Sequence, residues 1–511
     1  MKKILNFILN RMTVVAIAIT IQISFLLFFL WKLNEYFIYV QGLFMLLSIM
    51  LLFKIINSRS NPIYKIALII PLLTLPIIGA LLYFVLGNNK NMRIFKEKIL
   101  KEFLTISHYL AQDQNIINEL EELDKSIANQ SRYILNTSLF PIYKNTVTQY
   151  LSPGEVMFKK IIEELRQAKQ YIFMEFFILE EGLLWDEILA ILVQKVREGV
   201  EVRIMYDDMG SIYLLPPGFN QKLAGMGIQC IAFNPVSPVL SLRMNNRDHR
   251  KIVVIDGWVA FTGGINLADE YINAYPKYGH WKDAGIMVKG DAAWSFTFMF
   301  LHLWNATIPT DTDYECYKPL YHNRLPYASD GFVQPYADMP LDEDLVAENI
   351  YLNIINKAKN YVYINTPYLI ADNEIVTALC LAARNGVDVR IVTPHCPDKW
   401  YVHLVTKSYY SQLIEAGVKI YEYQPGFNHS KTFVADDELA TIGTANLDFR
   451  SLYLHFECGT WLYKSEAVRQ LKEDYLNTLK ICTQIQVEDI AAIKWPTRAL
   501  QSFVRIFAPL M

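Results

Sequence analysis

The feature that most constrains the fold is an internal repeat, in which one pattern of strands and helices occurs twice. Residues 171–175 (YIFME) and 361–365 (YVYIN) each follow a helical stretch, and each apolar run predicts a buried strand. A helical segment, a Gly-Val turn and a second strand come next, at residues 199–204 and 386–391. This order predicts an α/β fold with crossover helices, built as two similar α/β halves packed together.

The repeat is too long for a solenoid of short units, so duplication of a complete half is the simpler origin. A proline-rich stretch at residues 317–344 is the expected join between the halves. The expected domains are an N-terminal membrane anchor at 1–89, a helical connector at 90–135, a first half at 136–320 and a second half at 321–511.

Each half carries one H-x-K-x4-D segment and, downstream of it, one Gly-x-x-Asn segment. The residues are His249, Lys251, Asp256 and Asn266 in the first half and His429, Lys431, Asp436 and Asn446 in the second. Alternation along a strand would put the histidine and lysine of each segment on one face. One such segment is a weak signal, but two in register inside a repeat are specific. Duplicated, salt-bridged strand ends are the structural alternative, which the cost of burying polar side chains disfavours.

These residue types suit transfer at phosphorus. A neutral imidazole can attack phosphorus and form a covalent intermediate. A second imidazole can protonate the leaving alkoxide and then accept a proton from the incoming alcohol. Lysines and side-chain amides can hold the phosphoryl oxygens and stabilise the transition state, so no metal ion or cofactor is required. This scheme predicts that the two histidines meet where the halves meet.

Three uncharged runs at the N-terminus, residues 13–31, 36–53 and 66–86, predict a membrane anchor. A spanning helix needs about 20 apolar residues, so the first and third qualify and the second is slightly short. A cleaved signal peptide fits poorly, since no small-residue cleavage site follows the first run. The third run is either a further crossing or a re-entrant segment, because Pro71, Pro76 and Gly79 interrupt it. Basic flanks favour a multi-pass protein of the cell membrane with its large domain at the cytoplasmic face.

Charge and cysteine content exclude other classes of protein. A net charge of −3 gives no broad cationic field for a nucleic acid. Six scattered cysteines form no CxxC pair, which argues against a zinc site or a disulfide framework. The C-terminal stretch, residues 495–511, mixes apolar residues with arginines, so it either lies on an anionic membrane surface or packs against the body.

The paired motifs resemble the phospholipase D superfamily, and their context is similar to that of bacterial cardiolipin synthases. The resemblance runs from residue 61 to residue 511. It rests on NRDHRK at 246–251, GGINLADEY at 263–271, TPY at 366–368, HSKT at 429–432, GTANLD at 443–448, RS at 450–451, FE at 456–457 and the segment 76–87.

The resemblance implies transfer between two phosphatidylglycerol molecules, giving cardiolipin and free glycerol through a phosphohistidine. The residues of the two H-x-K-x4-D segments then match active-site positions, with Asp256 and Asp436 bracing strand and turn. Asn266 and Asn446 match phosphate-holding positions, and Glu270 and Glu457 match carboxylates that orient the histidines. His249 is the expected nucleophile and His429 the alternative.

Other functions share these residues. A phospholipase D-type hydrolase would deliver the same intermediate to water and release phosphatidic acid. A nuclease is disfavoured by the membrane runs and the lack of a basic patch. A membrane scaffold on an inactive fold is disfavoured because both motifs are intact. The expected partners are phosphatidylglycerol, cardiolipin and the lipid bilayer, without nucleic acid; the sequence names no protein partner.

Overall fold

The computed structural model describes Thr20, Ile21, Ser24, Phe28 and residues 37–58, 62–87, 90–236, 245–311, 313–319, 331–340 and 344–510. The chain divides into two compact units. The smaller unit comprises Met1–Lys98 and Asn234–Asn246, and the larger comprises Ile99–Phe233 and Arg247–Met511.

The described part of the smaller unit includes the helices α3 (Phe37–Ile56), α4 (Pro62–Thr74) and α5 (Pro76–Gly87) and the first residues of α6 (Lys90–Ile106). The chain bends at Leu75, before a proline that cannot donate a helical hydrogen bond, and α5 packs against α4. The two helices approach so closely that a Cβ at Gly79 would lie 2.4 Å from the Cα of Leu72. The run at 66–86 is therefore interrupted, as its prolines and glycine indicated.

The predicted membrane-spanning helices are not confirmed. Within the described ranges, no helix combines the length and the apolar character needed to cross a bilayer. The first run, residues 13–31, lies almost entirely outside the described residues.

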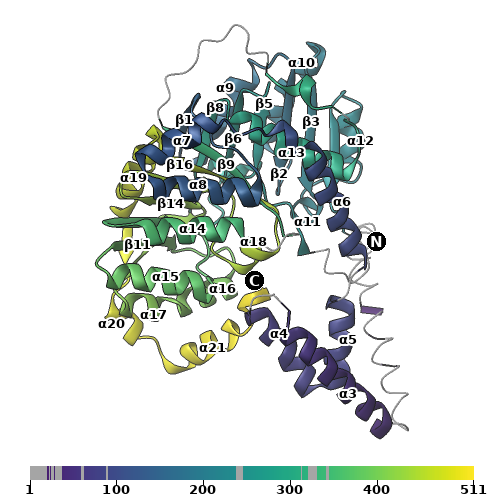
Figure 1. Ribbon diagram of the computed structural model, residues 1–511, viewed down its shortest axis with the longest axis vertical. Helices are drawn as coiled ribbons and strands as arrows, with labels where there is room; N and C mark the ends of the chain where they lie inside the picture. The colour runs from purple at the N-terminus through teal and green to yellow at the C-terminus, as the bar shows by residue number, and fades with distance from the viewer. Residues whose placement is uncertain are drawn as a thin grey trace. The chain divides into compact units, whose positions relative to one another are not determined.

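The larger unit contains two mixed sheets (Figure 1), and the strand order of the first is repeated in the second. The first sheet has the order β1-β8-β6-β5-β2-β3-β4, and the second has the order β9-β16-β15-β14-β10-β11-β12-β17, so the second repeats the first and adds β17. In each sheet three strands run parallel, β2-β3-β4 and β10-β11-β12, and the other pairings are antiparallel. The two similar α/β halves predicted from the repeat are confirmed.

The strands of the first half are β1 (Thr146–Leu151), β2 (Tyr171–Phe176), β3 (Glu201–Asp207), β4 (Gln229–Phe233), β5 (Ile252–Ile255), β6 (Val259–Gly263), β7 (His280–Lys282) and β8 (Gly285–Gly290). Those of the second half are β9 (Phe332–Asp338), β10 (Tyr361–Asn365), β11 (Asp388–Pro394), β12 (Lys419–Tyr423), β13 (Gly426–Asn428), β14 (Thr432–Ala435), β15 (Leu439–Gly443), β16 (Glu457–Tyr463) and β17 (Cys482–Gln484).

The helices before and within the first half are α6 (Lys90–Ile106), α7 (Gln114–Leu123), α8 (Lys125–Ser138), α9 (Gly154–Leu165), α10 (Leu183–Arg197), α11 (Asp208–Ser211), α12 (Phe219–Ala224) and α13 (Ala293–Thr307). Those of the second half are α14 (Val346–Lys357), α15 (Asn373–Arg384), α16 (Trp400–Ser408), α17 (Tyr410–Glu415), α18 (Phe449–Tyr453), α19 (Glu466–Leu479), α20 (Val487–Ala491) and α21 (Trp495–Arg505).

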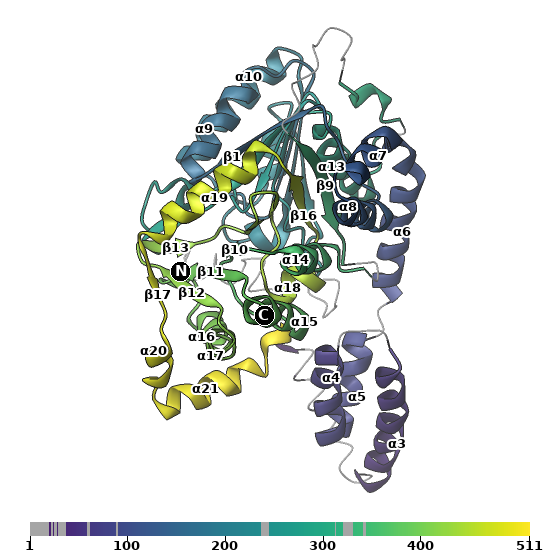
Figure 2. The same cartoon turned by 60° about the vertical axis from the view of Figure 1, so that its left-hand side comes forward.

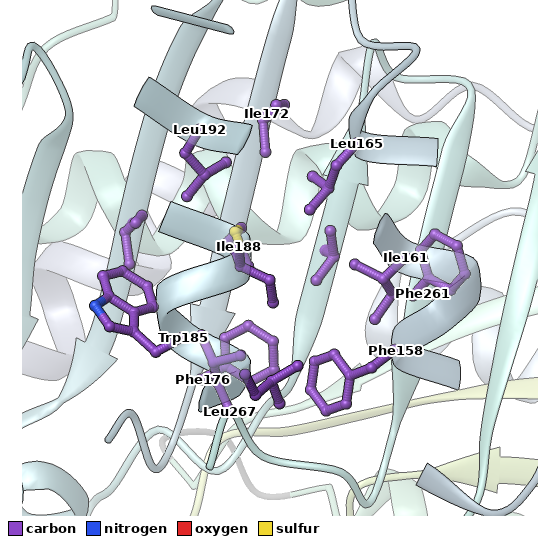
Figure 3. Close-up of a cluster of buried hydrophobic side chains, with 14 of the residues drawn as sticks. Phe158, Ile161, Leu165, Ile172, Phe176, Trp185, Ile188, Leu192, Phe261 and Leu267 are labelled. Atoms are coloured by element: carbon purple, nitrogen blue, oxygen red, sulfur yellow. The ribbon is translucent and has the colours of Figure 1, made fainter. Parts of the chain in front are cut away.

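The core of the first half lies between its sheet and helices α9 and α10 (Figure 3). Helix α9 buries Phe158, Ile161 and Leu165 at helical spacing and contacts β1, β5 and β8. Helix α10 buries Trp185 and Ile188 and contacts β3. These crossover helices hold β2 and β3 in place, and so position the segments that follow them at the edge of the sheet.

The two halves meet where β6 and β8 of the first sheet contact β15 and β16 of the second. The Thr262 hydroxyl and the Cys458 thiol, one from each half, lie 3.4 Å apart. Helix α13, which is apolar on all sides and almost wholly buried, contacts both the first sheet and β9. The halves therefore share one continuous interior.

Three details differ from the sequence-based expectations. The His-x-Lys segments precede strands β5 and β14 instead of lying within them. Strand β9 falls inside the proline-rich join, where it is an edge strand that tolerates Pro335. Helices α7 and α8 of the expected connector belong to the larger unit, in which α8 contacts α14 and β9.

Candidate active site

Both motif histidines line one cavity of about 450 Å³ within the larger unit. Aromatic side chains from both halves, including Phe177, Tyr271 and Tyr368, form much of its wall. His249 and His429 are each only 7% exposed, so the imidazoles are screened from bulk water except through this cavity. The two histidines therefore meet at a shared site, as the sequence predicted.

Each histidine is held by the opposite half of the molecule. The backbone N–H of His249 donates to the carbonyl oxygen of Phe456 at 2.9 Å, and that of His429 donates to Lys282 at 2.7 Å. The residue after each acceptor is a carboxylate that binds the Nδ1 of the same histidine. Glu457 Oε1 lies 2.8 Å from Nδ1 of His249, and Asp283 Oδ2 lies 2.6 Å from Nδ1 of His429. Each imidazole–carboxylate pair therefore contains one residue from each half.

The carboxylates fix the ring orientation and leave Nε2 of each imidazole for chemistry. Burial, reinforced by neighbouring lysine charge, lowers the pKa of His249 to about 3 and that of His429 to about 4. Burial would raise the pKa of Glu457, but His249 beside it holds that pKa well below its usual range. The Thr444 hydroxyl donates to the second oxygen of Glu457. The resting site therefore contains neutral imidazoles and an ionised glutamate.

The side chain of each motif lysine bonds to the backbone of the motif histidine two residues before it. Lys251 Nζ donates to the carbonyl oxygen of His249, and Lys431 Nζ donates to that of His429. Burial lowers the pKa of Lys251 to about 8 and that of Lys431 to about 7. The charges of Glu457 and Asp283 offset this loss of hydration only in part, so further negative charge nearby would stabilise the charged form of both lysines.

The predicted amides also face the cavity. Asn266 Oδ1 accepts from the backbone N–H of Ile178 at 3.0 Å, while its Nδ2 donates to the hydroxyl of Tyr271 at 2.7 Å. Asn446 Nδ2 donates to Asp448 at 2.8 Å. Both side chains line the cavity, as expected for groups that hold a phosphate, and their orientation is fixed by these bonds.

The two motif aspartates lie outside the cavity lining. Asp256 accepts from the backbone N–H groups of Lys169, Gln170 and Tyr171, and Asp436 accepts from those of residues 359–361. Each aspartate has a positive φ, in the turn after β5 or β14. They therefore brace the strand and turn, as the sequence interpretation had them do.

Replacing Asp256 with alanine is expected to lower the free energy of unfolding by about 2–4 kcal/mol, since three amides would lose a charged acceptor. The kcat of the folded fraction should stay within about threefold of wild type, because Asp256 contacts no group that lines the cavity. Chemical denaturation and an assay corrected for folded protein measure both quantities. A large loss of kcat at full folding would place this carboxylate in the chemistry.

Glu270 does not orient a histidine. Its carboxylate accepts from Lys277 Nζ at 2.7 Å and from the Tyr275 hydroxyl at 3.1 Å, at the wall of the cavity. The partner of His429 is Asp283, which the sequence interpretation missed. A signal was present, because Asp283 precedes Gly285 by two residues as Glu457 precedes Gly459, and these glycines pair with Gly263 and Gly443.

A third histidine, His455, was also missed. It lines the cavity with its ring centroid 5.3 Å from that of His249, and it is 8% exposed. Neither of its ring nitrogens has a hydrogen-bond partner among the described residues. A single histidine without matched spacing gives no signal in a sequence.

Two groups of side chains within the described residues have the geometry to hold a metal ion. One consists of His249, His455 and Glu457 in the cavity, and the other of Glu348, Asp372 and Glu374. The first shares its ligands with the imidazole–carboxylate pair, so a bound ion there would occupy the candidate nucleophile.

Comparisons with known proteins agree with this architecture. A family model described as cardiolipin synthase, PLD-like domain, matches residues 161–278 and 351–479, one segment in each half. A second model, described as phospholipase D-nuclease N-terminal, matches residues 46–88. The crystal structure of a phosphatidylserine synthase from Haemophilus influenzae Rd KW20 superposes with a TM-score of 0.53 at 16% identity, covering 75% of this chain and 98% of that one. That likeness shows the fold.

Relatives of higher identity extend along almost the whole chain. A cardiolipin synthase of Geobacillus sp. (strain WCH70) is 35% identical over 496 residues, covering 94% of this chain and 97% of that protein. A cardiolipin synthase of Halalkalibacterium halodurans is also 35% identical, over 461 residues, covering 89% of this chain and 90% of that protein. On this identity and coverage, the chain belongs to the cardiolipin synthase family of the phospholipase D superfamily.

Proposed function

We propose that this protein is a cardiolipin synthase that transfers a phosphatidyl group from one phosphatidylglycerol to another and releases glycerol. The observation that carries the proposal is the shared cavity lined by two imidazoles, each bound to a carboxylate of the other half and each with a lysine Nζ on its own backbone carbonyl oxygen. The named relatives supply the substrate class. The site residues are His249, Lys251, Asn266, His429, Lys431 and Asn446, with Glu457 and Asp283 as positioning residues.

The first step forms a bond between Nε2 of one imidazole and phosphorus and breaks the phosphorus–oxygen bond to glycerol. His249 is the proposed nucleophile, and His429 gives a proton to the departing glycerol oxygen. A bound phosphodiester anion favours the protonated form of the acid, because negative charge raises the pKa of a neighbouring imidazole. In the second step His429 accepts the proton of the incoming hydroxyl, whose oxygen displaces His249 from phosphorus.

The lysines and amides provide the charge stabilisation. Lys251 and Lys431 supply two ammonium groups next to the histidine backbones, and the side chains of Asn266 and Asn446, which line the cavity, add oriented dipoles for the phosphoryl oxygens. The aromatic wall limits access of water to the phosphohistidine, which favours transfer to an alcohol over hydrolysis.

Incubating the purified full-length chain with labelled phosphatidylglycerol in detergent tests the proposal. Cardiolipin and glycerol in equal amounts are the expected products. Phosphatidic acid as the main product would replace the proposal with a phospholipase D-type hydrolase.

The lysine charges predict the pH dependence. Because Lys431 and Lys251 have lowered pKa values of about 7 and about 8, the free enzyme loses their positive charge as the pH rises through this range. We expect kcat/KM to fall by about tenfold or more between pH 7 and pH 9, since anion binding weakens. The kcat should fall less, because the bound phosphodiester stabilises both ammonium groups. A flat kcat/KM profile over this range would contradict the assignment.

Chelation of divalent metals is expected to leave the rate unchanged within about twofold, because the lysines supply the positive charge that a metal would otherwise provide. The measurement compares initial rates of the purified chain before and after treatment with EDTA and gel filtration. A large loss that added metal restores would point to the cluster of His249, His455 and Glu457.

We also propose that the protein acts at the cell membrane, with its catalytic halves at the cytoplasmic face. The support is the run of apolar segments with basic flanks near the N-terminus and the match of residues 46–88 to the N-terminal family model. The domain boundaries expected from the sequence, after residues 89, 135 and 320, are part of the same proposal. A cysteine introduced at an exposed position of the catalytic halves should be shielded from impermeant reagents in intact cells.

A further inference from the structure

The C-terminal helix α21 and the turn after it carry their large apolar side chains on the outside of the larger unit. The exposed fractions are 79% for Trp495, 43% for Leu500, 59% for Phe503, 61% for Ile506 and 42% for Phe507. We name these five residues the C-terminal apolar face. At 100° per residue they occupy one side of the helix, so the exposed surface is a continuous stripe.

The opposite, polar side of α21 binds the protein. Arg498 Nη2 donates to the carbonyl oxygens of Ile490 and Ala491 at 2.9 and 3.0 Å. The guanidinium of Arg505 lies 4.2 Å above the ring of Tyr409, and Gln501 is only 7% exposed. A surface helix of a water-soluble protein normally has the reverse orientation, with the apolar stripe inward. The polar contacts therefore hold the helix with its apolar stripe facing outward.

Helix α21 is connected to the wall of the active-site cavity through α16. Helix α21 packs against α16 (Figure 2). At the start of α16, Trp400 is 66% exposed, while Tyr401 and Val402 line the cavity that contains the two histidines. Exposed apolar side chains thus occur both on α21 and at the start of the helix that borders the catalytic cavity.

We propose that the C-terminal apolar face, together with Trp400, lies in the surface of a phospholipid bilayer and seats the cavity over its lipid substrate. This inference rests on the proposed function for the identity of that substrate. Tryptophan and phenylalanine favour the boundary between headgroups and acyl chains. Lys399 and Lys494, which immediately precede α16 and α21, complement anionic headgroups. A second copy of the chain is the rival occupant.

A site-specific fluorescent label distinguishes these occupants. The full-length chain with Cys316, its exposed cysteine, replaced by serine receives Phe503→Cys, and a matched variant receives Thr497→Cys on the polar side of α21. An environment-sensitive dye is attached to each, and each protein is reconstituted in phosphatidylglycerol-rich vesicles. The same chain without the added cysteine gives the background. Quenching by iodide in the water is compared with quenching by doxyl groups on the lipid chains.

The label at position 503 is expected to be quenched by the lipid-borne groups and protected from iodide by at least about threefold relative to the label at position 497. Equal access of iodide at both positions would overturn the proposal. Protection from iodide without quenching by the lipid groups would also overturn it, and would show a protein neighbour, such as a second copy, on this face. Neither readout depends on which reaction the site performs.

Activity on vesicles gives an independent measure. The Phe503→Ser/Ile506→Ser variant is expected to need about tenfold more bulk lipid for half-maximal rate, with the rate at saturating lipid unchanged. Leu183→Ser/Leu381→Ser, which alters two exposed leucines on α10 and α15, is the matched control and should behave as wild type. An unchanged lipid requirement in the first variant would contradict the docking role even if transfer activity is intact.

Discussion

Replacing either His249 or His429 with asparagine is expected to lower the rate of cardiolipin formation by about 10³-fold or more. Each imidazole has its own carboxylate and its own lysine, so neither can take the place of the other. The measurement is the initial rate with labelled phosphatidylglycerol, together with a melting curve to show that each variant folds. His108→Asn, in the 3₁₀ turn Ser107–Tyr109 outside the cavity lining, is the control.

The same variants assign the nucleophile. A phosphatidyl ester of p-nitrophenol has a leaving group that needs no proton, so only the nucleophile is required for its first turnover. With this substrate, His429→Asn is expected to release p-nitrophenol in a burst and to hold the phosphatidyl group on the protein. His249→Asn should show neither. The opposite result would make His429 the nucleophile, and substantial turnover of phosphatidylglycerol by either variant would refute the two-histidine mechanism.

Replacing Glu457 with glutamine is expected to lower kcat by about 10²–10⁴-fold, because a neutral amide cannot stabilise the charge that develops on His249. Asp283→Asn should have an effect of similar size through His429. The KM should change much less, since neither carboxylate lines the cavity. Single-turnover formation of the protein-bound phosphatidyl group and steady-state kcat measure the loss at each step.

The Glu270→Gln variant tests whether Glu270 or Asp283 is a carboxylate that orients a histidine. If Glu270 oriented a histidine, as the family resemblance implied, its replacement would cost as much as that of Glu457. Its observed partners are Lys277 and Tyr275, so the loss of kcat should be far smaller than that of Asp283→Asn. Equal losses at Glu270 and Asp283 would contradict the site as described.

The sequence was sufficient to predict the architecture of the larger unit, because the two copies of the repeat can be compared with each other. Strands β2 and β10 begin at Tyr171 and Tyr361, where the apolar runs indicated. The cavity was predictable for the same reason, since two copies of one reactive pattern imply a shared site. The repeat identifies equivalent positions but not their neighbours, so the exchange of Glu457 and Asp283 between the halves was visible only in three dimensions.

Other features depend on tertiary packing that a linear pattern does not contain. The apolar stripe of α21 is evident in the sequence, which left open a membrane surface or the protein body as its neighbour. The pattern is the same in either case, and the contacts of Arg498 and Arg505 decide which side faces the protein. His455 gave no signal because its proximity to His249 depends on the contact of Phe456 with the first half.

The crossed contacts of the two halves have a consequence for the growing chain. During synthesis on the ribosome, His249 is made long before Glu457. The nascent fragment therefore contains this imidazole without its carboxylate partner. A truncated product that ends before this residue is therefore expected to have little activity on the membrane lipids around it. An ancestor with a single copy could have met the same requirement only as a symmetric dimer in which each subunit lent its carboxylate to the other.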